Sequence, residues 1–118
     1  MNLQKLFTQT QENYELIPFF IEQLLASDVY CLGARDEDNY IQFRVLETEE
    51  GEQAIPFFLE VETLQQDFGE DVAYVALNTR KLFEMTIGAT LVMNPTSDVS
   101  KEFQAEEIKA ILDIENQE

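Results

Sequence analysis

The chain has 118 residues, 45% of them apolar and 26% charged, an ordinary composition for one globular domain. Its charge balance is unusual, because 24 acidic residues against 7 basic ones give a formal net charge of −17. Such a surface repels nucleic-acid phosphates and anionic lipid, since neither would gain the counterion release that basic proteins exploit. We therefore expect a single domain over residues 1–118 that binds neither nucleic acid nor membrane directly.

Two explanations of the acidity stay open. The first is a well-solvated surface that keeps the domain soluble. The second is an acidic face for a basic partner, with a mimic of nucleic acid as its extreme form.

Cys31 is the only cysteine, so an intramolecular disulfide is excluded and a reducing cytosol suits the chain. No apolar run has the length of a signal peptide or a membrane span, and we expect a cytoplasmic protein. The composition does not indicate an oligomeric state.

Two helices are predicted at the start of the chain. Leu3, Leu6 and Phe7 recur at helical spacing behind Asn2, a suitable cap, so a first helix should cover about ten residues. The polar residues 8–13 suggest a frayed end or a turn. A second helix begins near Pro18, which suits a first turn. It carries an apolar stripe, with Phe19 beside it, that should make it a major core helix: Ile17, Phe20, Ile21, Leu24 and Leu25.

Three strands should follow as an antiparallel meander. Residues 28–32 are β-prone and should form a strand, which Gly33 is expected to end. Residues 40–47 alternate, which predicts one buried face carrying Ile41, Phe43 and Val45. Residues 52–59 form the third strand, and its proline at position 56 must sit at an edge or a bulge because it cannot donate to a ladder.

The pattern then alternates between helix and strand. Residues 61–68 suggest a short helix that stops at Gly69, and residues 73–77 a strand. Asn78 or Thr79 caps the next helix. Residues 91–93 form a continuous apolar strand, which predicts burial on both faces. Short links between these elements imply parallel crossovers.

The end of the chain is predicted as a polar loop and a last helix. A turn at Asn94-Pro95 precedes the loop, and the helix should run from about residue 105 to 113. Phe103 and Ile108 have the spacing of a hydrophobic staple around it. The fold class is therefore α+β, with a mixed sheet of about five strands, a meander followed by parallel crossovers, packed with about four to five helices.

Few residues suit a catalytic role. The chain has no histidine, which removes the commonest general base and metal ligand. Its serines stand outside nucleophile motifs. Cys31 lies between apolar neighbours without an adjacent base and is expected to be a buried structural thiol. Carboxylates at 36–38 and 47–52 lack calcium-loop spacing, so we predict no metal site, no cofactor and no catalytic residue, although a carboxylate enzyme stays an alternative.

The aromatic content suggests a protein partner instead. With 9 phenylalanines and 4 tyrosines, a domain of this size has enough rings to leave some at its surface. The alternative, that most of them are core, stays open. The surface residues that this hypothesis selects are Pro56, Phe57, Phe58, Phe83 and Met85.

Several segments in one order resemble the N-terminal domain of the SseB family, the bacterial enhanced-serine-sensitivity proteins. The resemblance covers residues 19–112. It is carried by Phe19-Phe20 and Leu24-Leu25 before Asp28-Val-Tyr30, by Ile55-Pro-Phe-Phe58 before Leu64-Gln-Gln66, by Arg80 and Leu82-Phe-Glu-Met-Thr-Ile-Gly88, by Leu91 and Asn94, and by Lys101-Glu-Phe103 before Glu107-Ile108.

The resemblance implies no established enzyme activity, cofactor or catalytic residue. Family members commonly carry Thr-Ser where this chain has Leu59-Glu60. Longer members have a second, C-terminal domain. We accordingly expect a non-enzymatic protein-interaction or regulatory module. A small-molecule or metal-binding enzyme that uses carboxylates, and an acidic nucleic-acid mimic, are the alternatives.

Overall fold

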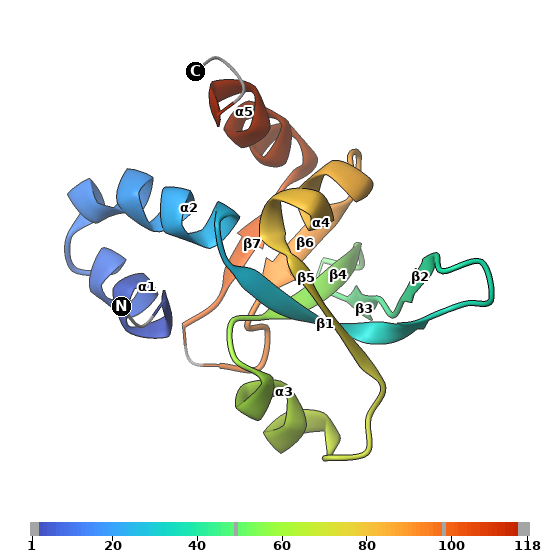
Figure 1. Cartoon of the computed structure of the whole chain (residues 1–118). Helices are drawn as coiled ribbons and strands as arrows, with labels where there is room; N and C mark the ends of the chain where they lie inside the picture. The colour runs from blue at the N-terminus through green and yellow to red at the C-terminus, as the bar shows by residue number, and fades with distance from the viewer. Residues whose placement is uncertain (1–2, 49, 98, 116–118) are drawn as a thin grey trace.

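The computed structural model describes residues 3–48, 50–97 and 99–115 (Figure 1). Over these residues the chain forms one seven-stranded mixed sheet with helices packed on it, which confirms the predicted fold class. The helices are α1 (Leu3–Thr10), the 3-10 helix η1 (Tyr14–Leu16), α2 (Ile17–Leu25), α3 (Val61–Phe68), α4 (Thr79–Met85) and α5 (Ala105–Glu115). The strands are β1 (Asp28–Arg35), β2 (Ile41–Phe43), β3 (Leu46–Glu47), β4 (Gln53–Phe58), β5 (Tyr74–Asn78), β6 (Thr90–Met93) and β7 (Lys101–Phe103).

The sheet is mostly antiparallel and has the order β2-β1-β4-β6-β7, with β3 paired to β4 and β5 paired to β1. β1 is antiparallel to both β4 and β5, and β6 is parallel to β4. It follows that β4, β5 and β6 run in the same direction. The connections through α3 and α4 are therefore crossovers, as predicted, although only β4 and β6 lie side by side as a parallel pair.

The predicted meander is corrected in one respect. Residues 40–47 do not form one strand, because β2 pairs with β1 whereas β3 pairs with β4. β1 and β4 also pair directly, with Tyr30 opposite Phe58. Val45 lies at the break between the two short strands and is 48% exposed, so its predicted place on a buried face is wrong. The break lets one segment serve two different partner strands.

The sequence predicted that Gly33 ends the first strand, and this prediction is wrong. β1 continues through it to Arg35. At φ 143° its backbone is in a region that side chains disfavour, and a Cβ there would lie 2.2 Å from the carbonyl oxygen of Gln42 in β2. The glycine therefore allows close approach of β2.

Pro56 lies in an internal strand, where a missing N–H is costly. On one side it stands opposite Val92 of the parallel neighbour β6. On the other side β4 pairs with β3 at Gln53 and Ala54 and with β1 from Phe57 onward. Pro56 falls in the gap between these two pairings, which is how an internal strand accommodates it without an edge.

Two further predictions about strands are corrected. β7 lies in the segment predicted as a loop, because its short polar sequence becomes a strand only by pairing with β6. β6 buries Leu91 and Met93 on one face, but Val92 is only half-buried on the other. With the division of residues 40–47 and the addition of β7, the described sheet has seven strands rather than about five.

The helix boundaries largely follow their local signals. Asn78 caps α4, its side chain accepting a 3.2 Å hydrogen bond from the Lys81 N–H. Glu60 stands at the N-cap position before α3 and makes no side-chain cap hydrogen bond. The Ile108 N–H donates to the Gln104 carbonyl at the start of α5, which extends two residues beyond its predicted end. The predicted cap Asn2 lies outside the described residues.

The sheet separates two apolar layers. The larger layer contains buried residues of α1, α2, α4 and α5, and the smaller one lies under α3. Figure 1 shows α3 on the opposite side of the sheet from α2, α4 and α5. Phe57 belongs to the larger layer and its neighbour Phe58 to the smaller one, since side chains alternate along a strand.

Candidate functional site

The five residues selected from the sequence do not form a surface patch. Phe57, Phe58 and Phe83 have no exposed area, Pro56 is buried, and only Met85, at 54%, is exposed. The expected exposure of these four is therefore wrong, because the sheet carries them into its two apolar layers. The ring of Phe57 packs on Phe83 and Phe103, which lie far along the chain, and the ring of Phe58 packs on Phe68 of the nearby α3.

Asn94 is buried and serves the fold. Its Oδ1 accepts a 3.1 Å hydrogen bond from the Leu59 N–H, and its Nδ2 donates to Gln4 Oε1 at 2.6 Å. Its backbone has φ 51°, a conformation that asparagine tolerates better than most residues. The turn after β6 thus joins α1 to the segment that enters α3.

Cys31 is buried, as predicted, on the face of β1 that contributes to the larger layer. Burial raises the pKa of its thiol from an ordinary 9.0 to about 12. The thiolate is the nucleophilic form of cysteine, so this residue is unsuited to catalysis near neutral pH.

Asp36 shapes the turn between β1 and β2. Its Oδ1 accepts hydrogen bonds from the backbone N–H groups of Tyr40, at 3.0 Å, and of Asp38, and its Oδ2 accepts from Gln42 Nε2. The Tyr40 N–H foremost, with the Gln42 amide and the Asp38 N–H, holds the pKa of the Asp36 carboxyl below its usual value. The carboxylate acts as a turn former. In the described part of the chain no three potential ligands gather closely enough to hold a metal ion.

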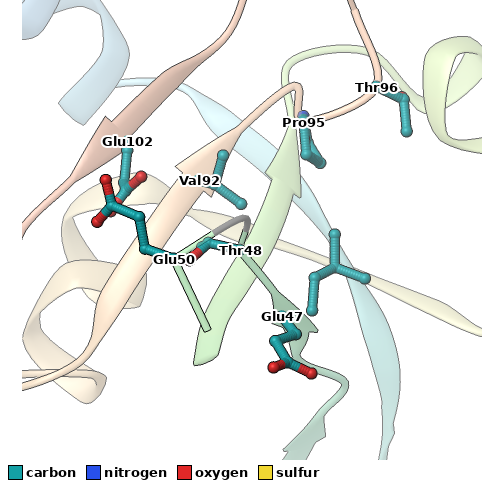
Figure 2. Close-up of a pocket in the computed structure, with 8 residues that line it drawn as sticks. Glu47, Thr48, Glu50, Val92, Pro95, Thr96 and Glu102 are labelled. Carbon is teal, nitrogen blue, oxygen red and sulfur yellow. The ribbon is translucent and has the colours of Figure 1, made fainter. Parts of the chain in front are cut away.

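The first surface cavity, which we term the carboxylate pocket, has a volume of about 390 Å³. It opens beside β3, β6 and β7 and is shown in Figure 2. Its lining residues are Leu46, Glu47, Thr48, Glu50, Val92, Pro95, Thr96 and Glu102. Figure 2 shows the Glu50 and Glu102 carboxylates on the same side of the view, with the Glu47 carboxylate pointing elsewhere. Negative charge at three points of the rim can attract a cation, but the groups do not converge on one centre.

The second cavity, which we term the apolar groove, has a volume of about 470 Å³. Its lining residues come from the segment that contains α1, η1 and α2 and from the segment that contains β7 and α5. Its lining residues are Phe7, Thr10, Gln11, Tyr14, Ile17, Phe20, Ile21, Ser100, Lys101, Glu107 and Ile111. Phe7 and Phe20 are buried, with ring centroids 5.2 Å apart. Tyr14 and Ile17 are 77% and 41% exposed. Apolar side chains therefore form both a buried base and an accessible rim.

The charges around this groove are mostly negative. Lys101 Nζ lies 3.0 Å from Glu107 Oε2, so the basic residue among the lining side chains is already paired. Exposed carboxylates stand on or beside the same helices, at Glu12, Glu15 and Glu106. An apolar centre with a charged rim is the usual anatomy of a protein-contact surface.

The apolar groove was not predicted from the sequence, although a signal for it was present. Ile17 was assigned to the buried stripe of the second helix, but it is partly exposed. Tyr14, Ile17 and Ile21 follow i, i+3 and i+7 spacing, which extends an apolar stripe in front of Pro18. The longer stripe indicates that the apolar face of this segment is too wide for a single neighbouring helix to cover.

Fold and surface together define a small, acidic α+β domain with an apolar groove and a separate carboxylate pocket. None of the described helices is long and apolar enough to cross a membrane. The family model described as "SseB protein N-terminal domain" matches residues 4–110, and the chain belongs to this family.

Two curated relatives are similar to this chain over 101 residues. Both are called "Protein SseB", one from Escherichia coli (strain K12) and one from Shigella flexneri, and each is 38% identical to it. The matched part is 80% of this chain and 39% of either relative. The chain thus corresponds to well under half of the relatives' length. None of the solved structures matches it.

Proposed function

We propose that this domain is a non-enzymatic protein-interaction or regulatory module of the bacterial cytoplasm. Its apolar groove would bind an amphipathic segment of a partner protein whose polar face is basic. The observation that carries the proposal is the groove itself, because its rim leaves Tyr14 and Ile17 accessible above the buried Phe7 and Phe20. The family relationship supports a bacterial setting and does not assign an activity.

The chemistry of the partner follows from that of the groove. Apolar side chains would gain about 25 cal/mol for each Å² of apolar area removed from water, which favours Leu-, Ile- or Phe-like anchors. A groove between helices suits an amphipathic helix with anchors at i, i+3 or i+4 and i+7. The exposed carboxylates at Glu12, Glu15 and Glu106 favour Lys or Arg on the outer face of that helix.

Site-specific photo-crosslinking tests this proposal. A photoreactive phenylalanine analogue replaces Tyr14 in the groove, or Tyr40 in the turn between β1 and β2. The two positions are matched, since both are tyrosines and they are 77% and 69% exposed. In bacterial cells that produce the protein, we expect a discrete adduct at position 14 and none at position 40. Adding Ile17→Asp should remove the adduct, because a carboxylate in the apolar rim opposes docking.

The same experiment can contradict the proposal. Equal adducts at both positions would indicate general stickiness, and no adduct at position 14 would count against a groove partner. An adduct that persists with Ile17→Asp and weakens steeply with salt would favour the acidic nucleic-acid mimic, since that alternative depends on charge alone.

A second candidate is a site for a small cation or amine in the carboxylate pocket, as an enzyme using carboxylates would need. The observation in its favour is that Glu47, Glu50 and Glu102 line one cavity. Titration with magnesium or with a primary amine should then shift the NMR signals of these residues, and Glu102→Gln should reduce the shift. Glu62→Gln, on α3, is the control. Shifts spread over the whole acidic surface would contradict this candidate.

A further inference from the structure

The exposed edges of the sheet differ in how they are protected. An unpaired edge attracts other strands unless charge, proline or shortness discourages pairing. β7 carries Lys101 and Glu102, and β3 has only two residues, one of them Glu47. β2 has three residues and is followed by Arg44. Each of these edges has at least one such device.

β5 has none of them. It is a five-residue strand, Tyr74–Asn78, that pairs along its whole length with β1 and with no other described strand. Its sequence, Tyr-Val-Ala-Leu-Asn, contains no charged residue, proline or glycine. Tyr74 and Ala76 are exposed and, two residues apart, share one face of the sheet. The longest outer strand of this acidic protein is therefore open to pairing.

The charges that flank β5 are complementary to each other. Glu70 and Asp71 precede the strand and are exposed. Arg80 and Lys81 follow it in the first turn of α4, and they are the only two adjacent basic residues in the whole chain. One end of the open edge is thus negative and the other end is positive, although the chain as a whole carries −17.

We propose that β5 pairs antiparallel with β5 of a second copy, which forms a two-fold symmetric dimer with one continuous sheet. Centring the pairing on Ala76 brings the acidic flank of each copy beside the basic flank of the other, twice by symmetry. It also pairs the open backbone groups, and it closes the edge so that assembly stops at two. None of the residues that line the apolar groove lies in β5, so the proposal is independent of that site.

The overall negative charge opposes association of two copies, but it does not forbid the dimer at physiological salt. At physiological salt the Debye length is about 8 Å, so most charges of one copy are screened from those of the other. In the dimer, the oppositely charged flanks of the two copies would be separated by much less than one molecular diameter. An interface made by one pair of strands buries little surface, about 1,200 Å² or less in total, which is the low end for protein interfaces. We therefore expect a weak, reversible dimer.

Sedimentation velocity of the full chain, from about 1 µM to about 1 mM in physiological salt, tests the proposal. We expect a monomer–dimer equilibrium that shifts with concentration. Ala76→Lys places two like charges opposite each other at the symmetry axis and should weaken the dimer about tenfold or more. Ala34→Lys is the matched control, because Ala34 is also an exposed strand alanine but lies opposite Gln42 of β2. It should leave the equilibrium unchanged.

A charge exchange gives a second readout that leaves the strand intact. Asp71→Lys alone and Lys81→Glu alone should each weaken the dimer about three- to tenfold, and the double variant should restore it. Thermal melting followed by circular dichroism verifies that each variant is folded. A monomer at every concentration, equal weakening by Ala34→Lys, or no recovery in the double variant would overturn the proposal.

Discussion

The two faces of the sheet differ in how they are covered, although the same strands contribute to both. Phe57 and Phe58 are adjacent, identical and fully buried. Phe57 enters a layer formed with four helices, where its ring meets Phe83 and Phe103 at centroid distances of 6.2 and 6.1 Å. Phe58 enters a layer closed by α3 alone and meets Phe68 at 6.0 Å. Two side chains that are equally buried can therefore contribute differently to the free energy of unfolding.

The largest expected effect is on the four-helix face. Phe57→Ala should lower the free energy of unfolding by about 3–5 kcal/mol, because several fixed elements surround the cavity and cannot collapse into it. Urea denaturation measures the loss. Phe58→Ala is the matched comparison and should cost less, since α3 can move toward the gap. An equal or larger cost for Phe58→Ala would contradict the difference between the two faces.

Leu64 tests the single-helix face directly. It is the fully buried residue of α3, and Leu64→Ala should cost about 2–4 kcal/mol. Because α3 covers its face alone, we expect local loosening before global unfolding. Hydrogen exchange should accelerate in α3 while α4 remains protected. Uniform acceleration across both helices would show that the two layers open as one unit.

Asn94 joins α1 to the segment that enters α3 through its bonds to Gln4 and Leu59. Asn94→Ala leaves the Leu59 N–H without its partner and should cost about 1–3 kcal/mol. The change also places alanine at positive φ, so Asn39→Ala is a suitable control: Asn39 has φ 69° but is exposed. Denaturation should show a smaller loss for Asn39→Ala. Equal losses would attribute the effect to backbone conformation alone.

Cys31 gives the smallest effect at neutral pH. Cys31→Ala should cost about 1 kcal/mol there. Because folding raises the thiol pKa from 9.0 to about 12, its contribution is complete below pH 9 and is lost as the pH rises through 12. Wild type should therefore lose more stability than Cys31→Ala over that interval in parallel urea titrations. Parallel pH profiles, or rapid alkylation of folded protein at pH 8, would contradict a well-closed four-helix face.

Local signals predicted the helices well for physical reasons. Asn78 can cap a helix wherever it stands before one, and Pro18 fits a first turn without needing distant partners. Strand limits were predicted less well. β7 exists because β6 lies beside it, and β2 and β3 are separate because their partners are different strands. Pairing partners are not recorded in the periodicity of a segment.

The candidate site shows the same limit more strongly. The sequence left open whether Phe57 and Phe58 lie at the surface or in the core, and in the structure each is buried in a different apolar layer. The groove that does reach the surface joins residues of η1 and α2 to residues of α5, about ninety positions away in the chain. A stripe such as Tyr14, Ile17 and Ile21 indicates an apolar face, but it does not say how much of that face another helix covers.

The amino-acid sequence alone determined the fold class, the Asn78 cap of α4, the family and the strong negative charge, because these depend on residue type and on spacing within a few turns. Only the tertiary structure decided which aromatic residues are core, where the apolar groove lies, and that β5 is the open edge. Those properties depend on which distant surfaces meet, and burial is a property of the contact rather than of the residue. The uncharged strand at Tyr74–Asn78 becomes informative only once its place at the edge of the sheet is known.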